Sequence, residues 1–435
     1  MKMSKIISLI LVVVMVLATF VACFPQNDNN DDEGKKPVSV PEYTQAEIDE
    51  LVAAYAGDYT ITMWVSDVDG VKEQFEAQIE AFEAKFPGIN ITATIDKVGE
   101  GDAGAQVIAD VVSAPDLYCF AQDQLAGLVQ ASAIAAPPSK IASMIKESND
   151  SGAIGAGTVG DKLYAYPYTS DNGFYMFYDK SLFPNEEDLD SMEKIIEICE
   201  ANGKTFRFPL DNAWYNAGFF FATGCESLWT ADKDGNFVDV KDTYNSDAGL
   251  VAMKGMQKLA QSKCYNPKND DYTDFGVCVT GTWAADGIKD VLGDNYAATD
   301  LPSFTVDGKS YHIGSYTGNK LMGVKPQVGD EKKAAVLALL AQFLTNADCQ
   351  QQRFEEFNWG PSNIKVQASD AVQSDVALAA FALQSEYGKP QGQIHSGWWN
   401  VAAALGANAK DYTAEADLKG ALVGYENAVK ALLEQ

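Results

Sequence analysis

The sequence predicts an α/β protein with two domains, which follow a disordered N-terminal segment. From residue 59 onward, short runs of β-branched and aromatic residues alternate with amphipathic helices, the pattern of a sheet covered by helices. The chain has 435 residues, which is too long for one small core and favours two domains. No internal repeat is evident, so the eight matching units of a β/α barrel are not expected.

The first elements follow a strand–helix–strand–helix–strand order. Residues 59–65 are a strand by their β-branched and aromatic content. Residues 71–86 place Phe75, Ile79, Phe82 and Phe86 on one apolar helical stripe, which ends at Pro87-Gly88. A strand that alternates apolar and polar residues, a helix and a third strand are then predicted at 89–95, 105–112 and 115–120. This order is typical of βαβ units.

The later elements are more mixed. Residues 162–178 are rich in Tyr and Phe and predict strands on both sides of a turn at residues 171–173. Further helices are predicted at 186–202, 248–263 and 332–343, a short strand at 277–283, strand-like pieces over 296–325, and mainly helices over 370–435.

The first 42 residues have the character of an export signal and a tether. Lys2 and Lys5 precede the apolar residues 6–20, which are few for a membrane-spanning helix. The sequence Phe20-Val21-Ala22-Cys23 resembles the lipobox of bacterial lipoproteins, although Phe20 replaces the usual Leu. This resemblance implies cleavage after residue 22 and lipid on Cys23. Residues 23–42 are polar and predict a disordered tether. A plain signal peptide with a chance cysteine and a retained anchor helix remain alternatives.

Charge and residue counts exclude several classes of function. The formal net charge is −29 and becomes about −31 without residues 1–22, which argues against nucleic acid and against electrostatic binding to anionic lipid. His312 and His395 are the only histidines, and neither lies in a recognisable nucleophile motif. The cysteine spacing does not indicate zinc, and we expect no metal and no cofactor. Free thiols are favoured over disulfides for the six cysteines after Cys23, which are Cys119, Cys199, Cys225, Cys264, Cys278 and Cys349.

Several stretches resemble the maltose- and maltodextrin-binding proteins, within family 1 of the extracellular solute-binding proteins of ABC importers. These stretches occur in the order of the family and span most of the chain. They are Ile61-Thr62-Met63-Trp64-Val65, Phe82-Glu83-Ala84-Lys85-Phe86-Pro87-Gly88-Ile89, residues 114–123, residues 162–168 with 178–180, Gly281-Thr282-Trp283-Ala284 and Gly397-Trp398-Trp399-Asn400.

The resemblance implies a two-lobed fold of the periplasmic-binding-protein type, class II, with a ligand cleft between lobes that several chain crossings join. We expect lobe 1 to contain residues 43–170 and 300–360, and lobe 2 to contain residues 171–299 and 361–435. Closure of such lobes around a ligand is a hinge motion. The resemblance also implies an oligosaccharide ligand, a membrane permease as partner, a monomer, and a place on the outer face of the cell membrane.

Neutral sugars present hydroxyl edges and apolar C–H faces, which suit acids or amides and flat aromatic rings respectively. By resemblance and local context, the predicted stacking residues are Trp399, Trp283, Trp214 or Tyr215, and Phe120. The predicted polar contacts are Asp123, Asp171, Asn172 and, as a weaker candidate, Asp67. Trp398 and Trp64 are expected to pack inward.

Rival functions stay open at this point. A glycoside hydrolase also uses aromatic rings and acids, but it needs two carboxylates at a set separation, and no spacing in the sequence singles out such a pair. Among binding proteins, another oligosaccharide or a polyamine is the alternative ligand to malto-oligosaccharide.

Overall fold

The computed structural model describes residues 38–434, and the predictions for the signal peptide, Cys23 and most of the tether lie outside these residues. One compact unit begins at Val40 and contains all of the helices and strands below. Within residues 38–434, no helix is both long and apolar enough to cross a membrane.

The first lobe is built on a five-stranded sheet. Its order is β2 (Ile89–Lys97), β1 (Gly57–Val65), β3 (Leu117–Ala121), β17 (Lys320–Val324) and β6 (Tyr166–Thr169). β1 runs parallel to β2 and β3, whereas β17 is antiparallel to β3 and β6. Every residue of β3 is buried, as expected for a central strand that helices cover on both faces. The predicted strand–helix–strand order is therefore confirmed.

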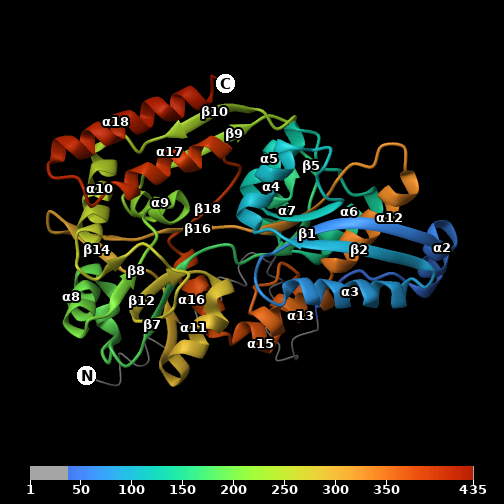
Figure 1. Ribbon diagram of the computed structural model, residues 1–435, viewed down its shortest axis with the longest axis horizontal. Coiled ribbons are helices and arrows are strands. Elements are labelled where there is room, and N and C mark those ends of the chain that lie inside the picture. Colours follow the sequence, from blue (N-terminus) through green and yellow to red (C-terminus); the bar gives the residue numbers. More distant parts are fainter. Residues whose placement is uncertain (1–37, 435) are drawn as a thin grey trace, which may run out of the picture. The chain divides into compact units, whose positions relative to one another are not determined.

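Helices cover this sheet (Figure 1), and their side chains pack with those of the strands in its core. The long helices α3 (Val71–Lys85) and α12 (Glu331–Leu344) contact one another and bury Phe75, Phe82 and Leu340 between themselves and the strands. Burying such a side chain contributes roughly 1.5–3 kcal/mol. The other helices of this lobe are α2 (Gln45–Tyr55), α4 (Glu100–Ala109), α5 (Leu125–Gln130), α6 (Ser139–Ser148), α7 (Ser151–Ala156), α13 (Ala347–Phe357) and α14 (Ile364–Gln367), and a small hairpin pairs β4 (Thr158–Val159) with β5 (Lys162–Leu163).

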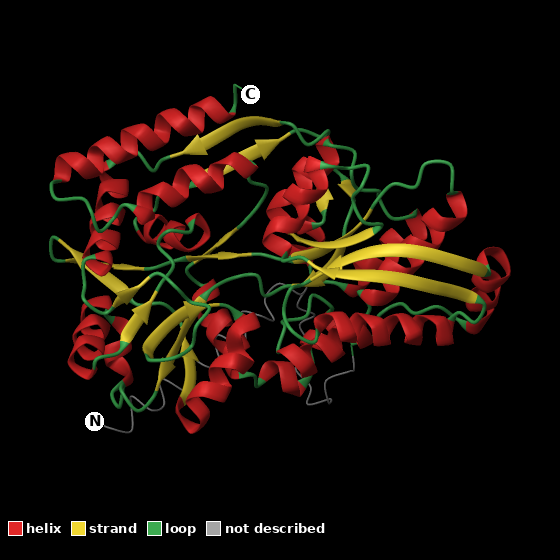
Figure 2. Ribbon diagram, viewed as in Figure 1, coloured by secondary structure: helices red, strands yellow, loops and turns green. Residues whose placement is uncertain are grey.

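The second lobe has its own sheet and helical layers (Figure 2), and this sheet has five strands. The strand order is β11 (Tyr265–Asn266), β8 (Thr205–Arg207), β12 (Phe275–Thr280), β7 (Tyr175–Asp179) and β13 (Tyr296–Thr299). Its helices are α8 (Met192–Asn202), α9 (Ala213–Ala222), α10 (Asp247–Ala260), α11 (Ala285–Leu292), α15 (Asp370–Gln373), α16 (Val376–Ser385), α17 (Ser396–Ala407) and α18 (Glu415–Leu432). Outside the main sheet lie the pairs β9 (Ser227–Ala231) with β10 (Phe237–Asp242), β14 (Ser303–Val306) with β15 (Lys309–His312), and β16 (Ser315–Thr317) with β18 (Gly388–Pro390).

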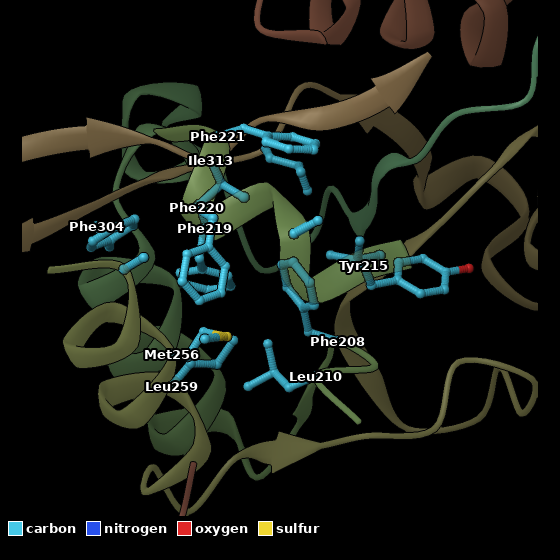
Figure 3. Packing of buried hydrophobic residues seen from close by; sticks show 14 of the residues in the cluster. Phe208, Leu210, Tyr215, Phe219, Phe220, Phe221, Met256, Leu259, Phe304 and Ile313 are labelled. Atoms are coloured by element: carbon cyan, nitrogen blue, oxygen red, sulfur yellow. The ribbon is translucent and has the colours of Figure 1, made fainter. Parts of the chain in front are cut away.

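Helix α9 is the centre of the core of the second lobe. Its residues 217–221 are buried, and Phe219 packs on Phe208 and Phe304 with ring centroids 5.4 and 5.2 Å away. Figure 3 shows these rings together with Met256 and Leu259 of α10, while the Tyr215 hydroxyl points away from them. An aromatic helix buried on nearly all sides has little amphipathic pattern, so the sequence does not reveal what it packs against.

Two expected lobe boundaries need correction. Leu301, Phe304, Ile313 and Tyr316 belong to the core of the second lobe, so the second crossing lies between β16 and β17 and not near residue 299. The third crossing follows α14 rather than residue 360, since Asn363 just before α14 bridges to Asn149 of the first lobe. Residues 300–317 therefore belong to the second lobe and residues 361–367 to the first. Alternating apolar residues predict that a strand is buried, but not which lobe buries it.

The six cysteines within residues 38–434 are all buried and unpaired: Cys119, Cys199, Cys225, Cys264, Cys278 and Cys349. Burial raises the pKa of the Cys199 and Cys349 thiols to about 12. Such thiols behave as small apolar side chains and are poor nucleophiles.

Candidate functional site

The first crossing between the lobes carries Asp171, which holds two other segments in place. Its carboxylate is 2% exposed, and Oδ2 accepts a hydrogen bond from the Gly360 amide at 2.7 Å and another from the Thr282 hydroxyl. Thr282 begins the 3-10 helix η3 (Thr282–Ala284) of the second lobe. A Cβ on Gly360 would lie 2.7 Å from the Asp171 Cβ, so this contact requires glycine at position 360. Asp171 is thus a buried link between the first crossing, the first lobe at Gly360 and the second lobe at Thr282.

Asn172 continues this link toward the first lobe. Its backbone amide donates to the Gly318 carbonyl of the second crossing at 3.1 Å. Its side-chain amide donates to Gln391 Oε1 at 3.0 Å, and Gln391 Nε2 donates in turn to Asp123 Oδ1 at 2.8 Å. Asn172, Gln391 and Asp123 are all less than 9% exposed. A chain of amides therefore joins the crossing segments to an acid of the first lobe.

Asp123 receives hydrogen bonds from the second lobe on both of its carboxylate oxygens. It lies in the 3-10 helix η1 (Gln122–Gln124), directly after the central strand β3. Oδ2 accepts from Trp399 Nε1 at 3.2 Å, and Gln391 Nε2 occupies Oδ1. Burial raises the pKa of Asp123 to about 7, although the hydrogen bond from Trp399 opposes this shift. Desolvation of the carboxylate thus outweighs the hydrogen bonds that favour its charged form.

The tandem tryptophans of α17 face different surroundings, because adjacent helical residues point about 100° apart. Trp398 is 0% exposed and donates from Nε1 to the Tyr425 hydroxyl at 2.8 Å, so the predicted inward packing is confirmed. Trp399 is half-buried and packs edge-on against Tyr316, with ring centroids 6.0 Å apart.

A second aromatic group lies next to Thr282. The half-buried rings of Trp283 and Trp214 have centroids 5.8 Å apart, and Phe174 packs on Trp214 at 4.8 Å. Trp214 opens α9, where the Asn212 side chain caps the helix by accepting from the Trp214 amide. Of the predicted pair, Trp214 keeps more accessible surface, since Tyr215 is 7% exposed and its hydroxyl accepts from Asn269 Nδ2 at 2.9 Å.

Two predicted residues lie outside this arrangement. Phe120 is 0% exposed and packs on Tyr118 inside a cluster of the first lobe, so its prediction as a stacking residue needs correction. Because side chains alternate along a strand, Phe120 points into the layer that contains α4 and α5 and not out of the sheet edge. Asp67 is exposed on the loop after β1, and the structure does not bring it to the other site residues.

Contacts at two further places bring the lobes together. At the tip between β9 and β10, Asn236 Oδ1 accepts from Gln130 Nε2 of α5 at 2.9 Å. A Cβ on Gly235 would lie 2.1 Å from the Ala126 carbonyl, and Gly235 has a φ of 88°, so this close approach needs glycine. Elsewhere, Asn358 donates to Asp286 Oδ1 at 2.8 Å. These contacts join the two lobes outside the crossing segments.

Sequence reasoning missed several residues that complete the site. Gln391 follows the short β18 and had no motif to mark it. Lys320 opens the buried strand β17, and its Nζ lies 5.2 Å from the Trp283 ring centroid and 4.8 Å from that of Trp359. A lysine directly before the apolar run Leu321-Met322 is a signal in the sequence, because a charged residue in a central strand is rare.

We expect Asp171→Asn to lower the free energy of unfolding by about 1 kcal/mol, because the neutral side chain makes weaker hydrogen bonds with Gly360 and Thr282. Urea unfolding followed by circular dichroism measures this change. The matched control is Asp67→Asn, which alters an exposed carboxylate and should change stability by less than about 0.5 kcal/mol. Equal stability of the two variants would show that the link at Asp171 does not contribute to folding.

Two α/β lobes, three crossings and a polar and aromatic junction define the class of two-lobed solute-binding proteins. The chain belongs to the bacterial extracellular solute-binding protein family, whose model matches residues 77–380. Members of this family are binding proteins rather than enzymes and work outside the cytoplasm. Comparison with curated protein sequences gives no match.

Solved structures share the fold over most of this chain. A structure described as "with acarbose" is 27% identical, with a TM-score of 0.73, and the match covers 87% of this chain and 99% of that one. The GacH receptor of Streptomyces glaucescens is 19% identical, with a TM-score of 0.71 and coverage of 86% and 98%. The maltose-maltodextrin binding protein of Alicyclobacillus acidocaldarius is 20% identical, with a TM-score of 0.69 and coverage of 87% and 100%. The predicted fold class and the resemblance to maltose-binding proteins are thereby confirmed.

Proposed function

We propose that this protein captures malto-oligosaccharides, or oligosaccharides of similar shape, between its lobes and delivers them to the permease of an ABC importer. The observation that carries the proposal is the junction itself. Half-buried tryptophan rings, Trp399 on one side and Trp283 with Trp214 on the other, are tied to Asp123 and to the crossing at residues 171–172 by hydrogen bonds and ring contacts.

The chemistry of these groups suits a neutral sugar. Flat indole rings cover the apolar C–H faces of a pyranose, while Asp123 and the amides of Gln391 and Asn172 match its hydroxyl groups. When the lobes separate, the hydroxyls of a ligand replace the Trp399 and Gln391 donors on the Asp123 carboxylate. A ligand that contacts both lobes then favours closure, because it makes those contacts only in the closed form.

A polyamine is the alternative ligand, and one contact disfavours it. The Lys320 ammonium already lies over the Trp283 ring, at 5.2 Å from its centroid. A ligand cation that sought the same ring would meet a like charge at this place.

The cell-surface part of the proposal concerns the segment before the folded unit. We propose that cleavage before Cys23 and acylation of that cysteine leave residues 23–42 as a tether that keeps the monomeric receptor close to its permease. Mass measurement of the mature N-terminus tests this, because acylation adds the mass of a diacylglyceryl group to Cys23. An unmodified Cys23 would mean a freely secreted receptor.

Calorimetric titration of the protein with maltotriose, cellotriose, xylotriose and spermidine tests the ligand. We expect maltotriose to bind with a dissociation constant in the range of roughly 1 μM, or about −8 kcal/mol, with no cleavage of the sugar. Spermidine binding without any response to sugar would overturn the proposal, and steady release of shorter sugars would identify a hydrolase instead.

A further inference from the structure

Lys320 and Glu100 form a buried charged pair beside the tryptophans of the junction. Lys320 is 7% exposed and Glu100, the first residue of α4, is 6% exposed. Lys320 Nζ lies 3.8 Å from Glu100 Oε2, which is too long for a hydrogen bond. Ser66 donates its hydroxyl to the same carboxylate oxygen at 3.2 Å. The two charges are therefore close, but they do not satisfy each other.

Hydrogen-bonding groups around this pair have no partner within residues 38–434. Glu100 Oε1 and Trp359 Nε1 are both buried and unbonded, as is the hydroxyl of Thr169, the residue that pairs with Lys320 across β6 and β17. Lys320 Nζ likewise donates no hydrogen bond shorter than 3.5 Å to any residue between 38 and 434. Folded proteins rarely leave buried polar groups unpaired, and a water, an ion or a ligand partners those that no protein atom reaches. One acceptor and at least two donors thus lack partners in one small region.

The cluster also bridges the two lobes. The Lys320 ammonium lies near both the ring of Trp283, from the second lobe, and the ring of Trp359, which packs in the core of the first lobe. Trp283 is a proposed stacking residue and contacts Trp214. A ligand ring stacked on Trp283 would therefore lie close to the Lys320 ammonium.

We propose that Lys320, Glu100 and Trp359 form a polar subsite that binds a pair of neighbouring hydroxyl groups on the sugar ring that stacks on Trp283. A hydroxyl both donates and accepts, so one diol can accept from Lys320 Nζ and Trp359 Nε1 while it donates to Glu100 Oε1. The subsite carries one positive and one negative charge and selects an uncharged group, since an anion would face Glu100 and a cation would face Lys320. This inference rests on the proposed binding of an oligosaccharide.

A purely structural ion pair is the competing explanation, and it makes a different prediction. If Lys320 and Glu100 serve a ligand, replacing either should weaken sugar binding, whatever it does to the melting temperature of the free protein, because removal of one partner leaves the other as an unpaired buried charge that itself lowers stability. If the pair stabilises the fold, the same replacement should lower that temperature and leave sugar affinity intact.

The test uses the full chain and the variants Lys320→Met, Glu100→Gln and Trp359→Phe. The matched control is Lys333→Met, which removes a lysine of the same lobe whose Nζ lies 3.0 Å from Asp116 Oδ1. Calorimetry with maltotriose, cellotriose and xylotriose gives the affinity, and thermal unfolding gives the melting temperature with and without sugar. We expect Lys320→Met and Glu100→Gln to bind the preferred sugar at least about tenfold more weakly, as for the loss of a charge-assisted hydrogen bond.

Trp359→Phe keeps a ring but removes the indole N–H, so a smaller loss of about threefold is expected for it. The control should bind like the wild type. The inference is overturned if the wild type binds a sugar and the Lys320 and Glu100 variants bind it with unchanged affinity, and the proposed function then still stands. If the wild type binds none of the three sugars, the proposed function fails and the subsite fails with it.

Discussion

Trp399→Ala should weaken oligosaccharide binding by at least about 2 kcal/mol, or roughly thirtyfold in the dissociation constant. The substitution removes the half-buried ring proposed to cover a sugar face and also the Nε1–H that bonds to Asp123 at 3.2 Å. Trp399 lies next to the fully buried Trp398 on a well-packed helix, so its ring is held in place before a ligand arrives. Calorimetry with maltotriose measures the change.

Two further variants separate the contributions of that side chain. Trp399→Phe retains an aromatic face but donates nothing to Asp123, so it should lose less affinity than Trp399→Ala. Trp64→Phe, at a half-buried position of β1 packed against the core of the first lobe, is the control for the loss of an indole and should bind normally. Affinity of Trp399→Ala equal to the wild type would remove Trp399 from the site.

The sequence predicts those features of the structure that depend on neighbouring residues, and it predicts less well those that depend on contacts between distant segments. Helix α3 and strands β1 and β2 are set by local apolar periodicity and by the stop at Pro87-Gly88, and they form where predicted. The strands predicted before and after residues 171–173 also form, and β6 and β7 belong to different sheets. The resemblance, and not the turn signal, placed a lobe boundary there. A turn signal cannot distinguish a hairpin from a crossing, because both need the chain to change direction.

The same reasoning applies to the candidate site residues. Asp123 follows a buried strand and Trp283 follows Gly281-Thr282, both of which are local features. The structure connects these two residues through the segment at 171–172. Gln391 contacts Asp123, and Glu100 contacts Lys320. The two residues of each pair are more than 200 positions apart in the sequence, so no local pattern could reveal these contacts. Phe120 was predicted from a local motif but is buried in the core, since the motif did not reveal which face of the sheet its ring occupies.

Asp123→Asn should change how stability depends on pH more than any other substitution considered. Burial raises the pKa of Asp123 to about 7 in the folded protein, above the ordinary value of 3.8 expected for the unfolded chain. The folded state therefore holds this proton more tightly. Its stabilising contribution is fully present below about pH 4 and is lost as the pH rises through about 7. One pKa unit corresponds to about 1.4 kcal/mol, so the loss is on the order of 4 kcal/mol.

Asparagine cannot titrate, so the variant should lack this loss. We expect the wild type to become less stable relative to Asp123→Asn between pH 5 and pH 8, as measured by urea unfolding at several pH values. Other titrating groups are common to both proteins and cancel in the difference, as does any constant change in the hydrogen bonds to Gln391 and Trp399. A difference that stays constant with pH would mean that the carboxylate remains ionised and that its two donors outweigh burial. In that case the hydrogen bonds from the second lobe would govern the charge of Asp123, and closure of the lobes would not depend on its protonation.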